Sequence, residues 1–267
     1  NLEYLDLSFN GIRDISPLAG LTKLKDLSLG GNPIQDIAPL EALTNLLCLK
    51  LFNCEASDYS VLAKLSNLEF LMLDRTPFSD AGLLSGLTQL NWLSLSFTQV
   101  KDVSPLAGLT NLKVLILTGC KAQDYAPLAK LVNLDFLMLD HATIADVSPL
   151  VSLTKLKHLY LTGSPINNYF PLSDIYQNLE QKDFTIAFTL AELGVIMDSG
   201  GKQAICDGKS ESVRINHIEW GAPPEDWLKN CVRTVFVQND YKIDIGYYPN
   251  FDAYVMMANK EIGRAHV

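Results

Sequence analysis

The most regular feature of the chain is a hydrophobic pattern that returns every 22 residues. The pattern runs without insertion from Asn1 to Tyr176 and defines eight units. In each unit two leucines stand two residues apart, and both recur at the same place in every later unit. The two columns are Leu5, Leu27, Leu49, Leu71, Leu93, Leu115, Leu137 and Leu159, and Leu7, Leu29, Leu51, Leu73, Leu95, Leu117, Leu139 and Leu161. A fixed period of this length predicts a stacked repeat protein.

The residues around each leucine pair predict a short strand. In residues 4–8 the side chains alternate, so that Leu5 and Leu7 point inward while their neighbours point outward. One repeat cannot bury its leucines alone, whereas stacked neighbours bury them jointly. We therefore expect a continuous leucine core that runs along the stack.

A polar column follows the strand in most repeats. Side chains at this position can form hydrogen bonds with the backbone at the turn that leaves the strand, and cysteine or threonine can partly imitate asparagine there. The alanine of the seventh repeat is the exception. The column consists of Asn10, Asn32, Cys54, Thr76, Thr98, Cys120, Ala142 and Ser164.

An acidic column lies four residues further on, at Asp14, Asp36, Asp58, Asp80, Asp102, Asp124 and Asp146. One interpretation is a ladder of calcium ligands. We favour a structural role, because each aspartate precedes a segment such as Ser-Pro-Leu. There its carboxylate can cap the free N–H groups of a short helical turn, with proline near the helix start.

The pattern Leu-x-x-Leu-x-Leu-x-x-Asn/Cys, followed two residues later by Ile or Val, resembles the leucine-rich-repeat family. The 22-residue length and the segment Asp-Ile-Ser-Pro-Leu-Ala-x-Leu-Thr are most similar to bacterial internalin-type repeats. The resemblance covers about two-thirds of the chain. It implies an α/β repeat solenoid: a horseshoe with parallel strands on the concave face. It also implies a protein-interaction module, in an adhesin-like role at a bacterial cell surface or after secretion, without identifying the partner.

A longer period lies within the shorter one. Residues 67–74, Asn-Leu-Glu-Phe-Leu-Met-Leu-Asp, return three repeats later as residues 133–140, Asn-Leu-Asp-Phe-Leu-Met-Leu-Asp. We infer that a block of three repeats was duplicated. The outward surface is therefore expected to present similar sub-sites twice.

Outward strand residues line the concave face, so the register alone identifies a candidate protein-binding site. With strands about 5 Å apart, apolar side chains on the third to eighth repeats would form a stripe of roughly 25 Å. Exposed aromatic and methionine side chains mark the core of a protein interface. The predicted binding residues, which we call the concave stripe, are Phe52, Phe70, Met72, Trp92, Val114, Ile116, Phe136, Met138, His158 and Tyr160.

Two acidic residues, Asp74 and Asp140, flank the concave stripe and would suit a partner that carries Lys or Arg at its edge. An external protein is the favoured occupant of this surface. Two alternatives remain, in which the chain's own C-terminal segment or a neighbouring copy covers it.

The last third of the chain departs from the period. After a partial ninth strand at residues 178–184, residues 189–197 have helical spacing and are expected to cap the solenoid. Strands are predicted at residues 213–220, 231–237, 241–246 and 251–257, with a helix at residues 224–229 and a hairpin turn at Asn239-Asp240. The expected domains are a solenoid at residues 1–184 and a small α+β module at residues 185–261. The tail at residues 262–267 is expected to be non-native.

Composition narrows the classes of function. The net charge of −9 and the lack of clustered Lys or Arg argue against nucleic-acid and membrane-surface binding. No apolar run is long enough to span a bilayer. Neither phosphate-binding loops nor hydrolase motifs occur, and the histidines share no ligand spacing with the cysteines, so we expect no catalytic residues, cofactor or metal. A nucleophilic Cys206 or Cys231 beside His217 would need an orienting group that the sequence does not supply.

The alternative function makes the repeats the substrate-recognition arm of a larger enzyme. The chain begins in phase with a repeat and without Met, so we expect a preceding segment that carries any export signal. Five cysteines are too few for a disulfide scaffold, and the pairing of Cys206 with Cys231 depends on the compartment.

Overall fold

The computed structural model describes residues 1–176 and 178–184, and the backbone of five strands at 187–189, 195–197, 204–206, 241–248 and 253–260. Two compact units divide the chain. The first comprises Asn1–Asn167 and Asp174–Phe184, and the second comprises Asn168–Ser173 and Thr185–Val267.

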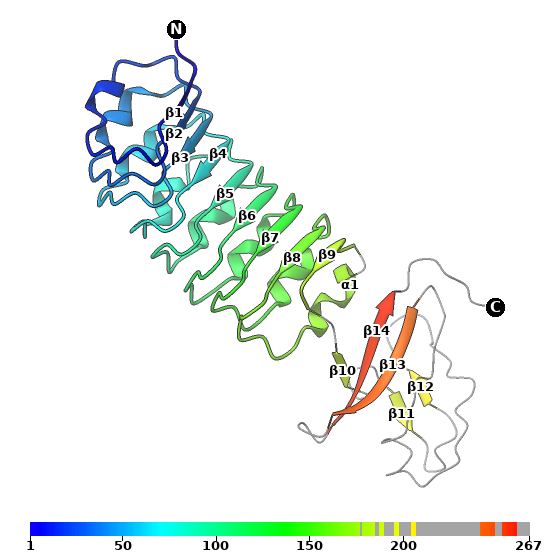
Figure 1. Cartoon of the computed structure of the whole chain (residues 1–267). Coiled ribbons are helices and arrows are strands. Elements are labelled where there is room, and N and C mark those ends of the chain that lie inside the picture. The colour runs from blue at the N-terminus through cyan, green and yellow to red at the C-terminus, as the bar shows by residue number, and fades with distance from the viewer. Residues whose placement is uncertain are drawn as a thin grey trace, which may run out of the picture. The chain divides into compact units, whose positions relative to one another are not determined.

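The first unit is a ladder of parallel strands, one from each repeat. Nine strands form a single sheet in sequence order, and Figure 1 shows them side by side from β1 to β9. The strands are β1 (Tyr4–Asp6), β2 (Asp26–Ser28), β3 (Cys48–Lys50), β4 (Phe70–Met72), β5 (Trp92–Ser94), β6 (Val114–Ile116), β7 (Phe136–Met138), β8 (His158–Tyr160) and β9 (Gln181–Lys182). This arrangement confirms the predicted strand positions and the partial ninth strand.

The register of the ladder follows the sequence period. From β1 to β8 every residue pairs with the residue 22 positions later, as in Leu5 with Leu27. At β9 the offset becomes 23, because His158 pairs with Gln181. Lys182 therefore takes the place of the inward leucine, and its ammonium group lies 4.3 Å from the ring centre of Tyr176. Partial burial lowers the pKa of Lys182.

Short 3₁₀ helices form the opposite side of the ladder (Figure 1). They are η1 (Ser16–Leu18), η2 (Ala38–Ala42), η3 (Ser60–Lys64), η4 (Ala81–Leu84), η5 (Ser104–Gly108), η6 (Ala126–Lys130) and η7 (Ser148–Ser152). A further 3₁₀ helix, η8 (Phe170–Leu172), is assigned to the second unit and is followed in the chain by α1 (Ser173–Tyr176). Between strands and helices lies the leucine core, in which the inward leucines from Leu27 to Leu161 have no exposed surface. Burial of leucine side chains contributes roughly 25 cal/mol per Å² of apolar area removed from water.

The acidic column binds the N–H groups at the start of the helical turns, as predicted. Asp80 is the N-cap residue of η4, and in the other six repeats the aspartate lies one residue before the N-cap. In each of the first seven repeats the aspartate Oδ1 accepts a hydrogen bond from the backbone N–H two residues later, at 2.8 to 2.9 Å. Proline occupies the first helical turn of η1, η2, η5, η6 and η7. These bonds satisfy backbone donors that a helix start leaves unpaired.

The polar turn column also forms its predicted hydrogen bonds. The Asn32 side chain donates to the carbonyls of Leu7 and Leu29 and accepts from the amides of Asn10 and Ile12. Cys54, Thr76, Thr98, Cys120 and Ser164 each donate one bond to a backbone carbonyl. Ala142 cannot donate, and Ser164 of the next repeat instead reaches the Leu139 carbonyl at 2.7 Å.

A second ladder of hydrogen bonds, not predicted from the sequence, links successive repeats. The asparagine that opens a repeat donates to the carbonyl of the threonine 23 residues earlier, as in Asn45 to Thr22 at 2.8 Å. The same bond recurs at Asn67, Asn111 and Asn133. Its signal was present, because asparagine and threonine recur at these positions with the same period of 22.

The second unit contains strands β10 (Ala187–Thr189), β11 (Val195–Met197), β12 (Ala204–Cys206), β13 (Tyr241–Tyr248) and β14 (Ala253–Lys260). β10, β14 and β13 form an antiparallel sheet in that order, and β11 pairs with β12. The strands predicted at 241–246 and 251–257 are confirmed, with later ends. The elements predicted at 213–220, 224–229 and 231–237, and the turn at Asn239-Asp240, lie outside the described residues.

The predicted capping helix at residues 189–197 is wrong. Thr189 ends β10 and Val195–Met197 form β11, each in an antiparallel pair. Phe188, Val195 and Ile196 are residue types that favour strands. The apolar spacing that indicated a helix is too short to distinguish the two structures, and pairing with distant strands decides it.

Candidate functional site

The concave stripe lies on one face of the ladder, as the alternation predicts. Its strand residues form two adjacent columns, in which each residue pairs with the next one along the column. The first column contains Phe70, Trp92, Val114 and Phe136, and the second contains Met72, Ser94, Ile116 and Met138. Each predicted residue of the stripe is partly exposed. The outward face therefore presents apolar side chains that remain in contact with water.

Rings on neighbouring strands contact one another in two groups. Phe70 on β4 stacks on Trp92 on β5, with ring centroids 3.9 Å apart and planes 8° from parallel. Phe136 on β7 contacts Tyr160 and His158 on β8, at centroid distances of 5.5 and 5.7 Å. Such contacts hold aromatic side chains in fixed orientations on the surface.

Phe52 belongs to a different group. Its ring contacts Phe9 at a centroid distance of 5.5 Å and covers Gly30, where a Cβ atom would stand 2.2 Å from the Phe52 ring. Phe52 therefore extends the concave stripe toward the N-terminal repeats. Lys50, which the sequence analysis left out of the site, lies 5.6 Å from the centre of the Phe70 ring.

The concave stripe is interrupted at its middle by a buried polar contact. Ser94 and Ser96 are buried although they point outward. The Asp74 carboxylate accepts hydrogen bonds from the Ser94 hydroxyl and, at 2.9 Å, from the Ser96 amide. Asp74 was predicted as an acidic rim for a partner, and the structure shows that one of its oxygens already bonds within the protein.

The second rim residue, Asp140, lies beside another carboxylate. Partial burial and the charge of Asp183 raise the pKa of Asp140. Asp183 accepts hydrogen bonds from the amides of Leu161 and Thr162, at 2.8 and 2.9 Å. Although partial burial pushes the pKa of Asp183 upward, hydrogen bonds from Thr162 and Leu161 outweigh it and hold this pKa below its ordinary value.

One edge of the concave face is formed by residues in the left-handed backbone conformation. The ninth position of every repeat from the first to the eighth has a positive φ, between 53° and 74°. Where this position holds Phe9, Phe97 or His141, the next repeat holds glycine, and the ring covers that glycine. Phe9 and Phe97 remain exposed at 72% and 44%. Neither is among the predicted binding residues, because both lie just beyond the strand.

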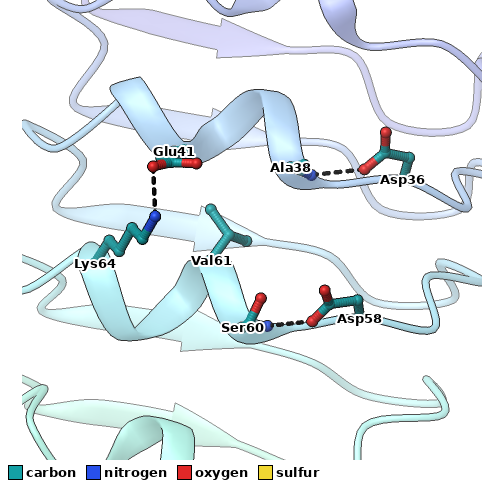
Figure 2. A pocket seen from close by; sticks show the side chains of 7 residues that line it. All are labelled: Asp36, Ala38, Glu41, Asp58, Ser60, Val61 and Lys64. Carbon is teal, nitrogen blue, oxygen red and sulfur yellow. Dashed lines mark hydrogen bonds and ion pairs between the residues drawn. The ribbon is translucent and has the colours of Figure 1, made fainter.

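A small hollow lies on the helical side between η2 and η3. Figure 2 shows its lining: Asp36 and Asp58 accept from the amides of Ala38 and Ser60, and Glu41 is paired with Lys64. Its volume is about 80 Å³, well below the roughly 300 to 1,000 Å³ of small-molecule sites. Its carboxylates form helix caps and an ion pair, so the hollow has a structural explanation.

The described side chains offer little reactive or metal-binding chemistry. Within residues 1–176 and 178–184, no three His, Cys, Asp or Glu side chains gather to hold a metal ion. Burial raises the pKa of Cys54 to about 11, and burial together with Asp26 raises that of Cys48 to about 12. A thiol with a raised pKa is a poor nucleophile. The side chains of Cys206, His217 and Cys231 lie outside the described residues.

The 22-residue ladder, the capped turns and the polar turn column together define a leucine-rich-repeat solenoid. A sequence profile described as Leucine Rich repeats (2 copies) matches residues 1–42 and 88–130. No curated protein matches the chain in sequence. Internalin C2 of Listeria monocytogenes is 34% identical, with a TM-score of 0.64 over 68% of this chain and 80% of that one. The chain belongs to the internalin-type leucine-rich-repeat family.

Two further structures are similar to this chain. A second Listeria monocytogenes internalin, inlF, is 32% identical over 70% of this chain and 61% of that one, with a TM-score of 0.59. A leucine-rich-repeat protein of Leptospira interrogans shares the fold, at 23% identity and a TM-score of 0.58, over 71% of this chain and 57% of that one. Such a scaffold is a protein-interaction module in general, and proteins of this class bind protein partners. Across the described residues, no helix is long and apolar enough to cross a membrane.

Proposed function

We propose that the chain binds a protein partner through the concave stripe, as an adhesin-like scaffold and not as an enzyme. The observation that carries this proposal is the row of partly exposed rings that runs from Phe70 and Trp92 to Phe136 and Tyr160 on one rigid sheet face. Large aromatic surfaces held in fixed orientations lose little conformational entropy on binding. They are enriched among the residues that dominate binding energy.

The proposal is tested with two variants that carry the same added charge on different faces. The first carries Trp92→Glu and Phe136→Glu. The matched control carries Val132→Glu and Val151→Glu, two exposed apolar residues outside the stripe, of which Val151 lies in η7. Circular dichroism establishes that both variants fold.

Each chain is used to capture proteins from host-cell and bacterial extracts, and captured proteins are then purified and titrated directly. We expect the original chain and the control to bind the same purified protein, and the stripe variant to bind it at least about 100-fold more weakly. Equal affinities for all three chains would overturn the proposal. In the alternative, the repeats recognise the substrate of an enzyme. That alternative requires the full-length gene product to convert the captured protein chemically.

A further inference from the structure

The duplicated block places the same three outward residues on the concave face twice. Phe70, Met72 and Asp74 lie on and just after β4, and Phe136, Met138 and Asp140 lie on and just after β7. The two triplets occupy equivalent register positions three strands apart. They differ in what surrounds the aspartate.

In the first triplet the aspartate is used by the fold. Asp74 Oδ1 accepts from the Ser94 hydroxyl and from the Ser96 amide on the next repeat. This carboxylate therefore links its own repeat to the next one by two hydrogen bonds. Its hydrogen bonds offset part of the cost of holding a charge at a partly buried position.

In the second triplet the groups equivalent to these two donors form hydrogen bonds with other residues. The residue equivalent to Ser94 is Tyr160, whose hydroxyl donates to Gln181 Oε1 at 2.6 Å. The amide of Thr162, equivalent to that of Ser96, donates to Asp183 at 2.9 Å. Within the described part of the chain, Asp140 Oδ1 is buried and has no hydrogen-bond partner. Asp140 therefore stands beside a second carboxylate with one of its own oxygens unpaired, and the neighbouring His141 offsets the burial and the charge of Asp183 only in part.

Most charged residues in the outward columns are acidic. Along the outward columns lie Asp6, Asp26, Asp74 and Asp140, with Asp183 directly after β9, and their basic counterpart in these columns is Lys50 on β3. The net charge of the whole chain is −9. A complementary partner therefore presents basic residues to the β7–β9 end of the face.

We infer that the β7–β9 end of the concave face receives an arginine or lysine side chain of the protein partner. The aliphatic stem lies along the rings of Phe136 and Tyr160, and the cationic group lies at the carboxylates of Asp140 and Asp183. Long basic side chains combine an apolar stem with a charged end, and aromatic rings attract cations that lie against them. Arginine is preferred, because its planar guanidinium donates to two oxygens at once. This inference rests on the proposed function of the concave stripe.

The probe for the test is a random library of 12-residue peptides displayed on phage and selected on the full chain. Peptides enriched on the original chain are expected to carry an arginine or lysine next to an apolar residue. Selection on Asp140→Asn is expected to lose this preference for a basic residue, whereas selection on Asp74→Asn retains it. The Asp140→Asn substitution keeps the size of the side chain and removes only its charge, so this variant is expected to fold.

A double-mutant cycle then measures the pair directly. For an enriched synthetic peptide, replacing its basic residue by norleucine and replacing Asp140 by Asn are each expected to weaken binding about tenfold. The two changes together are expected to weaken it little more than either alone, because both remove one interaction. Additive losses, or a basic preference that survives in Asp140→Asn, would overturn the inference.

The stripe variant with Trp92→Glu and Phe136→Glu separates this inference from the proposed function. If the concave stripe is the binding surface, that variant enriches none of the same peptides. Peptides that bind both the original chain and the stripe variant would contradict the proposed function. Peptides that need the stripe but show no basic preference would leave the proposed function standing and overturn the inference about Asp140.

Discussion

The ring of Phe97 lies directly over Gly119 of the next repeat, with its Cδ1 atom 2.7 Å from the point where a Cβ atom on Gly119 would stand. Both residues occupy the left-handed ninth position of their repeats, with φ of 55° and 70°. The guanidinium group of Arg75, from the preceding repeat, lies over the Phe97 ring, 4.6 Å from its centre. An aromatic residue at this position therefore requires glycine one repeat later.

Gly119→Ala is expected to lower the free energy of unfolding by about 2 kcal/mol or more, because it adds left-handed strain and a clash with Phe97. Gly108→Ala is the matched control. Gly108 ends η5, and a Cβ atom there meets nothing within 4 Å, so its effect should stay within about 0.5 kcal/mol. Adding Phe97→Ala to Gly119→Ala should recover the part due to the clash. Urea denaturation measures all four proteins, and equal losses for the two glycines would contradict the prediction.

The polar turn column should contribute unequally along the solenoid. Asn32 is 1% exposed and joins four backbone groups. Asn32→Ala is therefore expected to cost about 3 kcal/mol of unfolding free energy, since it leaves buried donors and acceptors unpaired. Thr98 donates one bond, to the Leu95 carbonyl at 2.8 Å, so Thr98→Val should cost about 1 kcal/mol. Thermal unfolding of both variants tests whether Asn32→Ala is the more destabilising change. A larger loss of stability in Thr98→Val would contradict the prediction.

Acid should destabilise the fold through the helix caps. Hydrogen bonds from the N–H and hydroxyl of Ser60 lower the pKa of Asp58, and the equivalent bonds from Ser104 lower that of Asp102. A carboxyl with a lowered folded pKa stabilises the fold above its unfolded value of 3.8, and this contribution is lost as pH falls through the folded pKa. Unfolding midpoints should therefore drop below about pH 4. Asp58→Asn with Asp102→Asn keeps an oxygen acceptor but removes the titration, so it should flatten that drop. An unchanged acid profile would refute the assignment to the caps.

Asp140 and Asp183 should respond in opposite directions to loss of charge. The folded pKa of Asp140 is raised, so its charged form destabilises the fold at neutral pH, and this penalty disappears as pH falls below the unfolded value of 3.8. Asp140→Asn should raise the unfolding midpoint at pH 7 and leave it unchanged near pH 3. Asp183→Asn should lower the free energy of unfolding at pH 7 by about 1 kcal/mol. The reason is that a side-chain amide has a single oxygen, whereas two backbone N–H groups donate hydrogen bonds to Asp183. Denaturation at the two pH values checks both signs.

Much of the solenoid could be predicted because its causes are periodic. The spacing of Leu5 and Leu7 set the strand and its inward face, and repetition at 22 residues set the pairing of each strand with the next. The aspartate caps were predictable for the same reason, since Asp102 bonds to an amide only two residues away. These features depend on contacts that are local or separated by one period.

The chemistry of the concave face was harder to predict. Ser94 points outward but is buried, because Asp74 one repeat earlier bonds to it. Asp140 has the same sequence context as Asp74, yet Asp183 removes its amide partner. Alternation shows which face a residue lies on, whereas its exposure depends on side chains of adjacent repeats. The helix predicted at residues 189–197 was wrong, because residues 195–197 pair with a strand that carries no repeat signal.

The constant offset of 22 between paired residues has a consequence for how such a gene can change. Because residues 67–74 and 133–140 are near copies, a deletion or duplication between these two points would remove or add 66 residues and leave the repeats in phase. Every strand at the junction would still meet a partner at the same register, and its inward leucine would still face the core. The number of strands in the sheet can therefore grow or shrink in steps of three repeats, while the pairing at an offset of 22 residues stays unchanged.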